Sequence, residues 1–338
     1  MKSFFAILLA VLSGIFNFFT TDGSFTQLKE KGDITGYSEI VSADKELPVL
    51  YTDSNGKFTV LQFSDTHFTT GLSWNDVKVL RKMEELTTKY TPDLVVVSGD
   101  MLDDGESGAY NKQFSLDKIM GLFESLEQYW AYIPGNNDGI KYGTSADVTA
   151  YLSQSEYCLC ADVKEISGGA QYTIDISDGE KPVHSFVFLD TMDYDNEDDE
   201  HIYGYVHADQ VEWCKKAIDE KIRLNEDIML SVFIHENTPN FAKAAIEGEV
   251  YKDGYSTLDE VKEEYNIPQN APLDDVFAYS GRVGLISMGH VHPKEGRCSF
   301  YNGTYYHITP QVKVSSTLIT IDTKADNVRD MYNFEQVN

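Results

Sequence analysis

Five short polar segments, each at or near the end of an apolar run, constrain this chain more than any other feature. They are Asp65-Thr66-His67, Gly99-Asp100, Gly135-Asn136-Asn137-Asp138, His235 and Gly289-His290-Val291-His292. Most of the apolar runs have the length and content of buried strands. Because open α/β sheets place their ligands at the carboxyl ends of strands, we expect side chains distant in sequence to converge at one sheet edge.

The order of expected strands and helices predicts an α/β fold. Strands are expected over 58–63, 93–98 and 129–133, with helices over 74–90 and 114–127 between them. This alternation implies right-handed crossovers and at least partly parallel pairing. Further strands are expected over 171–176, 184–189, 228–234, 283–288, 305–308 and 317–321, with a helix over 207–222 and a polar excursion containing one or two helices over 248–280.

We therefore expect one domain over residues 57–325, a four-layer αββα sandwich with two mixed β-sheets. Before it lies a polar segment, 22–56, which leads into the domain, and after it a C-terminal tail, 326–338. Residues 1–21 contain a sixteen-residue run, 4–19, that is almost wholly apolar. Its length suits a signal peptide, and secretion or delivery to a lysosome-like lumen is the leading inference. A retained membrane anchor is the alternative, since no clean cleavage site follows.

The four cysteines and one sequon leave alternatives open. Cys158 and Cys160 are too close in sequence to bridge comfortably, so a disulfide would join one of them to Cys214 or Cys298. Free buried thiols are the alternative. Asn302-Gly303-Thr304 is a glycosylation acceptor in a secreted chain, and it is equally a hairpin turn between two expected strands.

The charge balance restricts the partners. The chain has 27 Lys plus Arg against 55 Asp plus Glu, for a net charge of -28. Such a surface repels nucleic acid and anionic membranes, so we expect no nucleic-acid partner. A phosphoester substrate needs a local positive centre, and bound metal supplies one.

The polar segments contain ligands suited to two divalent cations. Two cations about 3.5 to 4 Å apart need a shared ligand, and the carboxylate of Asp100 suits that position. Asp65 and His67 are two residues apart, as are His290 and His292. On an extended chain residues with this spacing face the same side, so each pair can bind one ion. Asn136 offers a neutral oxygen. Carboxylates and imidazoles favour Mn, Zn or Fe.

These residues resemble the calcineurin-like metallophosphoesterase superfamily, whose pattern is D-x-H, G-D, G-N-H-D or G-N-H-E, a lone His, and G-H-x-H. The corresponding stretches here are FSDTHF, VVSGDM, IPGNND, FIHEN and MGHVHP, and the resemblance covers roughly residues 58–321. It implies that Asp65, His67, Asp100 and His292 hold one metal, and that Asp100, Asn136, His235 and His290 hold the second. Residues 203–213 are similar to a motif of the acid-phosphatase-like branch.

One departure concerns the proton donor. The superfamily usually has His after the metal-binding Asn, followed by an acidic residue, whereas this chain has Asn137 followed by Asp138. An amide cannot transfer a proton at neutral pH. Substitute donors are His201, His207 or Asp104. The purple acid phosphatases have Tyr where this chain has Asp103, so we expect a colourless site. The acidic run 193–200 is expected to be a solvated loop rather than a calcium site.

The resemblance implies a metal-dependent phosphatase or phosphodiesterase. We expect a hydroxide bound by both metals to attack phosphorus in line. The alternative, which Asn137 raises, is a catalytically weak protein of the same fold that keeps its metals and serves in binding.

Overall fold

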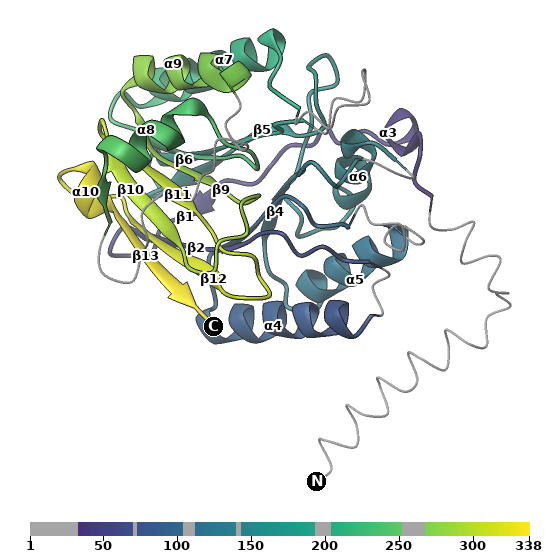
Figure 1. Ribbon diagram of the computed structural model, residues 1–338. Coiled ribbons are helices and arrows are strands. Elements are labelled where there is room, and N and C mark those ends of the chain that lie inside the picture. Colours follow the sequence, from purple (N-terminus) through teal and green to yellow (C-terminus); the bar gives the residue numbers. More distant parts are fainter. Residues whose placement is uncertain (1–32, 70–72, 104–111, 140–142, 193–203, 252–267) are drawn as a thin grey trace, which may run out of the picture.

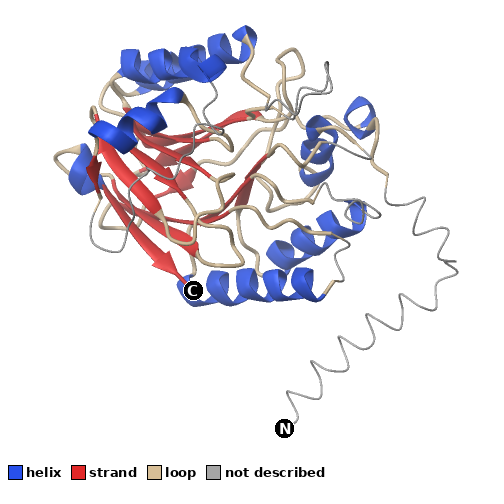
Figure 2. Ribbon diagram, viewed as in Figure 1, coloured by secondary structure: helices blue, strands red, loops and turns tan. Residues whose placement is uncertain are grey.

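Two mixed β-sheets pack against each other, and helices cover the outer face of each (Figures 1 and 2). The computed structural model describes residues 33–69, 73–103, 112–139, 143–192, 204–251 and 268–338. Element labels follow Figure 1. This arrangement is the predicted four-layer sandwich.

The five-stranded sheet has the order β13-β12-β2-β3-β4. β2, β3 and β4 pair in parallel, while β12 is antiparallel to β2 and to β13. Helices α4 and α5 lie on the outer side of this sheet (Figure 1). The elements are β2 (Lys57–Phe63), α4 (Trp74–Tyr90), β3 (Leu94–Ser98), α5 (Lys112–Ser125), β4 (Trp130–Ile133), β12 (Ser316–Asp322), α10 (Val328–Met331) and β13 (Tyr332–Val337).

The eight-stranded sheet has the order β1-β5-β6-β7-β9-β11-β10-β8. Its central strands β6, β7, β9 and β11 are parallel. Helices α7, α8 and α9 cover its outer face (Figure 1). The elements are β1 (Leu50–Tyr51), β5 (Gln171–Ser177), β6 (Pro182–Leu189), α7 (Ala208–Leu224), β7 (Met229–Phe233), α8 (Pro239–Glu247), β8 (Glu249–Val250), η4 (Pro268–Asn270), α9 (Ala271–Ser280), β9 (Val283–Met288), β10 (Arg297–Tyr301) and β11 (Thr304–Ile308). Two further helices, α3 (Tyr37–Ile40) and α6 (Ser145–Leu152), lie beside the sandwich.

Local sequence explains why α4 begins and ends where it does. The Ser73 side chain accepts a hydrogen bond from the Asp76 backbone N–H, and the Asp76 carboxylate accepts one from the Ser73 N–H, so the helix starts with a capping box. Val79, Met83 and Leu86 are buried, which matches the spacing of one helix face. The helix ends at Thr91, whose backbone is left-handed.

Aromatic side chains fill the space between the sheets. Phe58 of β2 lies 5.8 Å from Phe186 of β6, measured between ring centroids, and His307 of β11 stacks on Phe334 of β13 at 5.0 Å. Both contacts join a strand of one sheet to a strand of the other. Large buried rings contribute much of the apolar area in such a core, so these contacts help to hold the two sheets together. A second core lies between the eight-stranded sheet and α7, α8 and α9; it includes Cys214, Phe241 and Phe277.

The structure differs from the sequence-based expectation at the C-terminus. We expected a tail over 326–338, but Tyr332–Val337 forms β13, which pairs with β12 over its whole length. Tyr332, Phe334 and Val337 are buried, so this stretch is the edge of the sheet rather than a free tail. Likewise, the segment 22–56 contributes β1, which pairs with β5.

The structure selects between several of the open alternatives. All four cysteines are free and buried, with the sulfur atoms of Cys158 and Cys160 3.3 Å apart. Residues 301–304 form the turn of the β10–β11 hairpin, with positive φ at Asn302 and Gly303. Glycosylation at Asn302 stays a prediction. The signal peptide and the acidic run 193–200 lie outside the described residues, and among the helices that are described none is long and apolar enough to span a membrane.

Candidate metal centre

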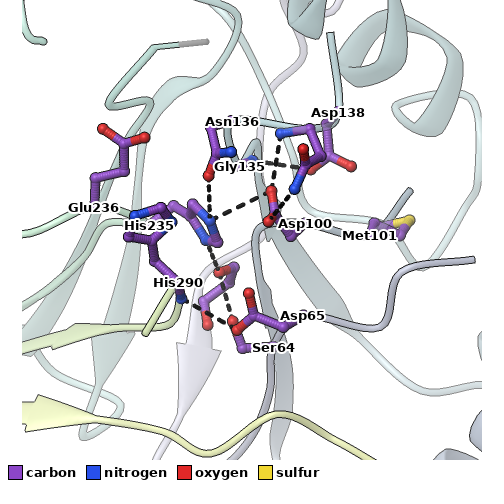
Figure 3. Close-up of polar contacts among 12 residues, drawn as sticks. Ser64, Asp65, Asp100, Met101, Gly135, Asn136, Asp138, His235, Glu236 and His290 are labelled. Carbon is purple, nitrogen blue, oxygen red and sulfur yellow. Dashed lines mark hydrogen bonds and ion pairs between the residues drawn. The ribbon is translucent and has the colours of Figure 1, made fainter. Parts of the chain in front are cut away.

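The predicted ligands lie in loops that follow five strands. They are Asp65 and His67 after β2, Asp100 after β3, Asn136 after β4, His235 after β7, and His290 and His292 after β9. β2, β3 and β4 are parallel neighbours in one sheet, and β7 and β9 are parallel neighbours in the other. Figure 3 shows five of these side chains, from both sheets, directed toward one another, whereas the neighbouring Glu236 points away. The five are Asp65, Asp100, Asn136, His235 and His290.

Asp65, His67, Asp100 and His292 form the first group, in which one ligand atom from each lies within 4.8 Å of the others. The His292 Nε2 is 2.9 Å from Asp65 Oδ1 and 3.0 Å from His67 Nε2. The His67 Nε2 is also 3.7 Å from Asp100 Oδ2. Two carboxylates and two imidazoles thus face a common point.

Asp100, His235 and His290 form the second group under the same limit of 4.8 Å. The His235 Nε2 lies 3.3 Å from Asp100 Oδ1 and 3.2 Å from the amide oxygen of Asn136. The His235 and His290 rings are 5.2 Å apart between centroids. Asp100 belongs to both groups, which is the arrangement a shared bridging carboxylate requires.

The backbone at the site is in an unusual conformation. Asp65, His67, Asp100, His290 and His292 all have positive φ, between 45° and 66°. Residues other than glycine rarely adopt this region, and such positions concentrate at functional sites. Hydrogen bonds between loops stabilise this backbone conformation. The Asp65 N–H donates to Gly99 O at 3.1 Å, and the His67 N–H donates to Asp100 O at 3.0 Å.

Two glycines allow the loops to approach each other closely. Gly99 has a φ of 86°, and a Cβ there would lie 2.2 Å from His235 Nδ1. A Cβ at Gly289 would lie 1.9 Å from Ser64 Oγ. Any side chain at either position would therefore push the ligand loops apart. This explains why Gly precedes Asp100 and His290 in the sequence.

Charges within the site shift the ligand pKa values. Burial alone would raise the pKa of Asp65, but the hydrogen bond from His292 and the charge of His235 lower it below its usual range. The same opposition holds at Asp100, where burial raises the pKa but the charge of His235 and its hydrogen bond lower it strongly. Both carboxylates are thus held as anions, the form that binds cations.

The histidines of the second group have opposite shifts. Burial lowers the pKa of His235, but Asp100 and Asp65 raise it, giving a net rise to about 10. Burial and the charge of His235 lower the pKa of His290 to about 3. The His235 Nδ1 is 2.8 Å from the backbone oxygen of Ser98, so it donates there and leaves Nε2 directed at Asp100 and Asn136.

The residues at the usual proton-donor position face inward. The backbone N–H of Asn137 donates to Asp100 Oδ1 at 2.9 Å, and its side-chain Nδ2 donates to Asp100 Oδ2 at 2.5 Å. Asp138 is fully buried and accepts from the N–H groups of Leu102 and Gly135, both at 2.8 Å. Burial and the charge of Asp100 raise the pKa of Asp138 to about 6. Asn137 thus holds the shared carboxylate of Asp100 in place through two hydrogen bonds, one to each oxygen.

Of the substitute donors named from sequence, only His207 lies in the part of the chain that the structure describes. His207 is exposed and precedes α7, where its backbone N–H donates to the Gln210 side chain at 2.9 Å. His201 and Asp104 lie outside the described residues. Asp103 lies in the loop after β3, and its N–H donates to Phe68 O at 3.0 Å.

Sequence analysis missed two residues that support the site. Ser98 supplies the carbonyl that orients His235, and as the last residue of an apolar strand it gave no sign of this role. Asp190 follows β6 and is fully buried. Burial raises the pKa of the Asp190 carboxyl, and the nearby charge of His235 opposes part of that rise. Its place directly after an apolar run was the available signal, since the predicted ligands share it.

The donor set fits divalent cations. The first group offers two carboxylates and two imidazoles, and the second offers a carboxylate, two imidazoles and an amide oxygen. Such mixed oxygen and nitrogen donors suit Mn, Zn or Fe, and the four thiols lie elsewhere in the two cores, outside both groups. The residues therefore fit a two-metal centre.

Comparisons with known proteins identify the family of the chain and its fold. The family model described as Calcineurin-like phosphoesterase matches residues 58–294. A dimetal phosphatase from Danio rerio has a similar structure, with a TM-score of 0.54 and 12% identity over 83% of this chain and 99% of that one. A putative 5'-nucleotidase from Staphylococcus aureus gives a TM-score of 0.49 and 15% identity, over 83% of this chain and 53% of that one. Identities this low show a shared fold alone. No curated protein matches the chain.

Proposed function

The chain belongs to the calcineurin-like phosphoesterase family, and we propose that it hydrolyses phosphoesters with one divalent cation in each of its two ligand groups. The observation that carries the proposal is the sharing of Asp100 by two groups of ligand atoms, each within 4.8 Å. Two cations in such a centre lower the pKa of a bound water and stabilise charge on the phosphoryl oxygens.

The protein's own residues keep the shared carboxylate in place. Asn137 donates to both oxygens of Asp100, and His235 lies 3.3 Å from one of them. Ser98 fixes the ring of His235 through Nδ1. These bonds orient the ligands before any substrate binds, so little reorganisation is required at the moment of reaction.

The inward position of Asn137 restricts the substrate class. Neither residue at this position offers a proton to a leaving group. The Asn137 amide donates to Asp100, and the buried carboxylate of Asp138 accepts hydrogen bonds from backbone N–H groups. We propose that the preferred substrates are esters whose leaving group is stable as an anion, such as aryl or phosphorylated groups. General acid catalysis contributes about 10²- to 10⁴-fold, so poor leaving groups would react that much more slowly.

Turnover of p-nitrophenyl phosphate and of its bis-ester, by protein reconstituted with Mn²⁺, tests the proposal. Wild type should hydrolyse at least one ester, and Asp100→Asn should lose about 10³-fold or more in kcat, because the shared carboxylate no longer balances two cations. Asp227→Asn removes one exposed carboxylate just before β7, at the other end of that strand from His235; it is the control and should keep full activity.

A second candidate function is binding without catalysis, and Asn137 is the observation that favours it. The same assay separates the two. If neither ester is turned over while metal analysis shows both ions bound, the protein is a binding protein of this fold. The predicted signal peptide, residues 1–21, supports action outside the cytoplasm, and the net charge of -28 supports a small phosphoester rather than nucleic acid as partner.

A further inference from the structure

Three lysines surround a hollow beside the loop that carries Asp65. The hollow has a volume of about 200 Å³ and is lined by Asn75, Lys78, Val79, Lys82 and Lys313. The first four belong to the early turns of α4, and Lys313 belongs to the loop between β11 and β12. Lys78 and Lys313 are exposed and Lys82 is half-buried, so their ammonium groups edge a depression open to solvent.

These positive charges have no acidic partners in the part of the chain that the structure describes. No ion pair there involves Lys78, Lys82 or Lys313, whereas Lys215, Lys216, Lys221 and Arg329 each form one. The Lys82 ammonium donates to the backbone oxygen of Val314 at 2.8 Å, and burial lowers its pKa. In a chain with 55 acidic and 27 basic residues, three uncompensated cations around one hollow favour an anion there.

Hydrogen bonds connect the two elements that line the hollow to the loop that carries Asp65 and His67. On one side, the Val312 N–H donates to Ser64 O at 3.0 Å, directly before Asp65. From this bond and standard backbone dimensions, the Cα atoms of Lys313 and Asp65 lie within about 11 Å of each other. On the other side, the Thr69 N–H donates to Asp76 Oδ1 at 3.2 Å, which ties the His67 loop to the first turn of α4.

From this juxtaposition we infer that Lys78, Lys82 and Lys313 form a second anion site, which takes a distal phosphate of a substrate whose reacting phosphoester lies at the metal centre. The inference rests on the proposed function and adds a substrate class to it. Lysine binds phosphate as a compact point charge, and the Asn75 amide adds a neutral donor at the rim. A distal phosphate would also relieve the repulsion among the three ammonium groups.

Matched substrates test the site. We suggest p-nitrophenyl alkyl phosphodiesters in two forms, one with a plain alkyl chain and one with a phosphate at its far end, over a series of chain lengths. Both release the same chromophore, so they differ only in the distal group. For wild type, KM should be about 10-fold lower for the phosphate-bearing form at the best length, with kcat unchanged, because the gain is uniform binding.

The double variant Lys78→Gln/Lys313→Gln should raise KM for the phosphate-bearing form about 10-fold and leave the plain form unchanged. Lys82 is kept, because it bonds Val314. The control is Lys89→Gln/Lys118→Gln, which removes two exposed charges from α4 and α5 outside the hollow and should alter neither KM. Equal KM values for the two forms in wild type, or an equal rise for both in the double variant, would overturn the inference.

Two further outcomes separate this inference from others. If inorganic phosphate alters turnover of the plain diester, and the double variant abolishes that effect, the hollow takes a free anion and the substrate-borne assignment is wrong. If neither diester is hydrolysed while both ions are bound, the inference fails, and the proposed function fails with it only when p-nitrophenyl phosphate is not turned over either. Hydrolysis of both forms at equal KM would instead leave the proposed function standing and reject the second site alone.

Discussion

Asn137 is the single residue with the largest consequence for the chemistry of the site. Replacing it with His should restore a proton donor beside the metal centre. We expect Asn137→His to raise kcat on alkyl phosphates, whose leaving group needs a proton, by about 10- to 100-fold, and to change aryl phosphates little. The slope of log kcat against leaving-group pKa should therefore become shallower, which a series of substituted phenyl and alkyl phosphates would measure.

The matching control is Asn137→Ala. This variant removes the hydrogen bond from Nδ2 to Asp100 without adding a donor, so it should lower turnover of all leaving groups alike. If His and Ala at position 137 have the same effect on every substrate, Asn137 acts only by holding Asp100, and the lack of a proton donor is not what limits the reaction.

The residues that gather at the candidate metal centre could be predicted from the sequence, but their conformation could not. Motif spacing named the residues that form both groups, including His235, which is marked only by the short stretch FIHEN. The positive φ angles at Asp65 and Asp100 depend on bonds to other loops, and local sequence does not encode those bonds. The same holds for Asn137, whose role depends on where Asp100 lies.

At the level of strands, a chain of buried hydrogen bonds links the two sheets beneath the metal centre. Gln62 of β2 donates to Ser98 Oγ of β3 at 2.9 Å and accepts from Ser287 Oγ of β9 at 2.6 Å. Ser287 Oγ is 2.8 Å from His307 Nδ1 of β11, and Thr317 Oγ1 of β12 is 3.3 Å from His307 Nε2. His307 is thus bonded at both nitrogens between the sheets.

This position makes His307 a source of acid sensitivity. Burial lowers the pKa of His307 to about 3, below its usual 6.5. Between these values the unfolded chain binds a proton that the folded protein does not, so stability is lost as the pH falls below 6.5, by up to about 1.4 kcal/mol per pH unit. His307→Gln should remove this contribution, and the variant's free energy of unfolding should fall less steeply between pH 6.5 and 4.5.

Urea unfolding of metal-free protein at several pH values measures the effect. The difference between wild type and variant isolates His307, because all other groups titrate in both proteins. His207→Gln, which replaces an exposed histidine, is the control and should follow the wild-type curve. A variant curve parallel to wild type would mean that His307 is protonated within the fold.

Most strands and long helices could be predicted from sequence, and the misses have physical causes. Helix α6 is buried on all sides, so it lacks the one-sided apolar pattern that reveals a helix, although Thr144 and Asp147 form a capping box at its start. In β13, burial alternates along most of the strand, so its sequence does contain a period-two signal. Its partner strand β12 is close to it in the sequence. The ring of Tyr332, however, packs against His184 of β6, with centroids 6.1 Å apart, and a contact so distant in sequence is not visible in the local pattern.

Across the whole molecule, the metal centre joins the two sheets. Asp65, Asp100 and Asn136 follow strands of the five-stranded sheet, whereas His235 and His290 follow strands of the eight-stranded sheet. Asp100 and His235 face each other at 3.3 Å across this boundary. Cations bound between them would cross-link both halves of the core in the folded state only, and binding to the folded state alone stabilises a protein.

Metal should therefore raise the melting temperature, and more so at higher pH. At ion concentrations of 100 to 1,000 times Kd the gain is about 3 to 4 kcal/mol, or roughly 4 to 6 °C for a chain of this size. Asp100 and Asp65 raise the pKa of His235 against the effect of burial to about 10, so the metal-free protein holds a proton that a cation must displace. Differential scanning calorimetry with and without Mn²⁺ should show a larger shift at pH 8 than at pH 6, and almost none in Asp100→Asn. A shift independent of pH, or one retained in Asp100→Asn, would place the cation elsewhere.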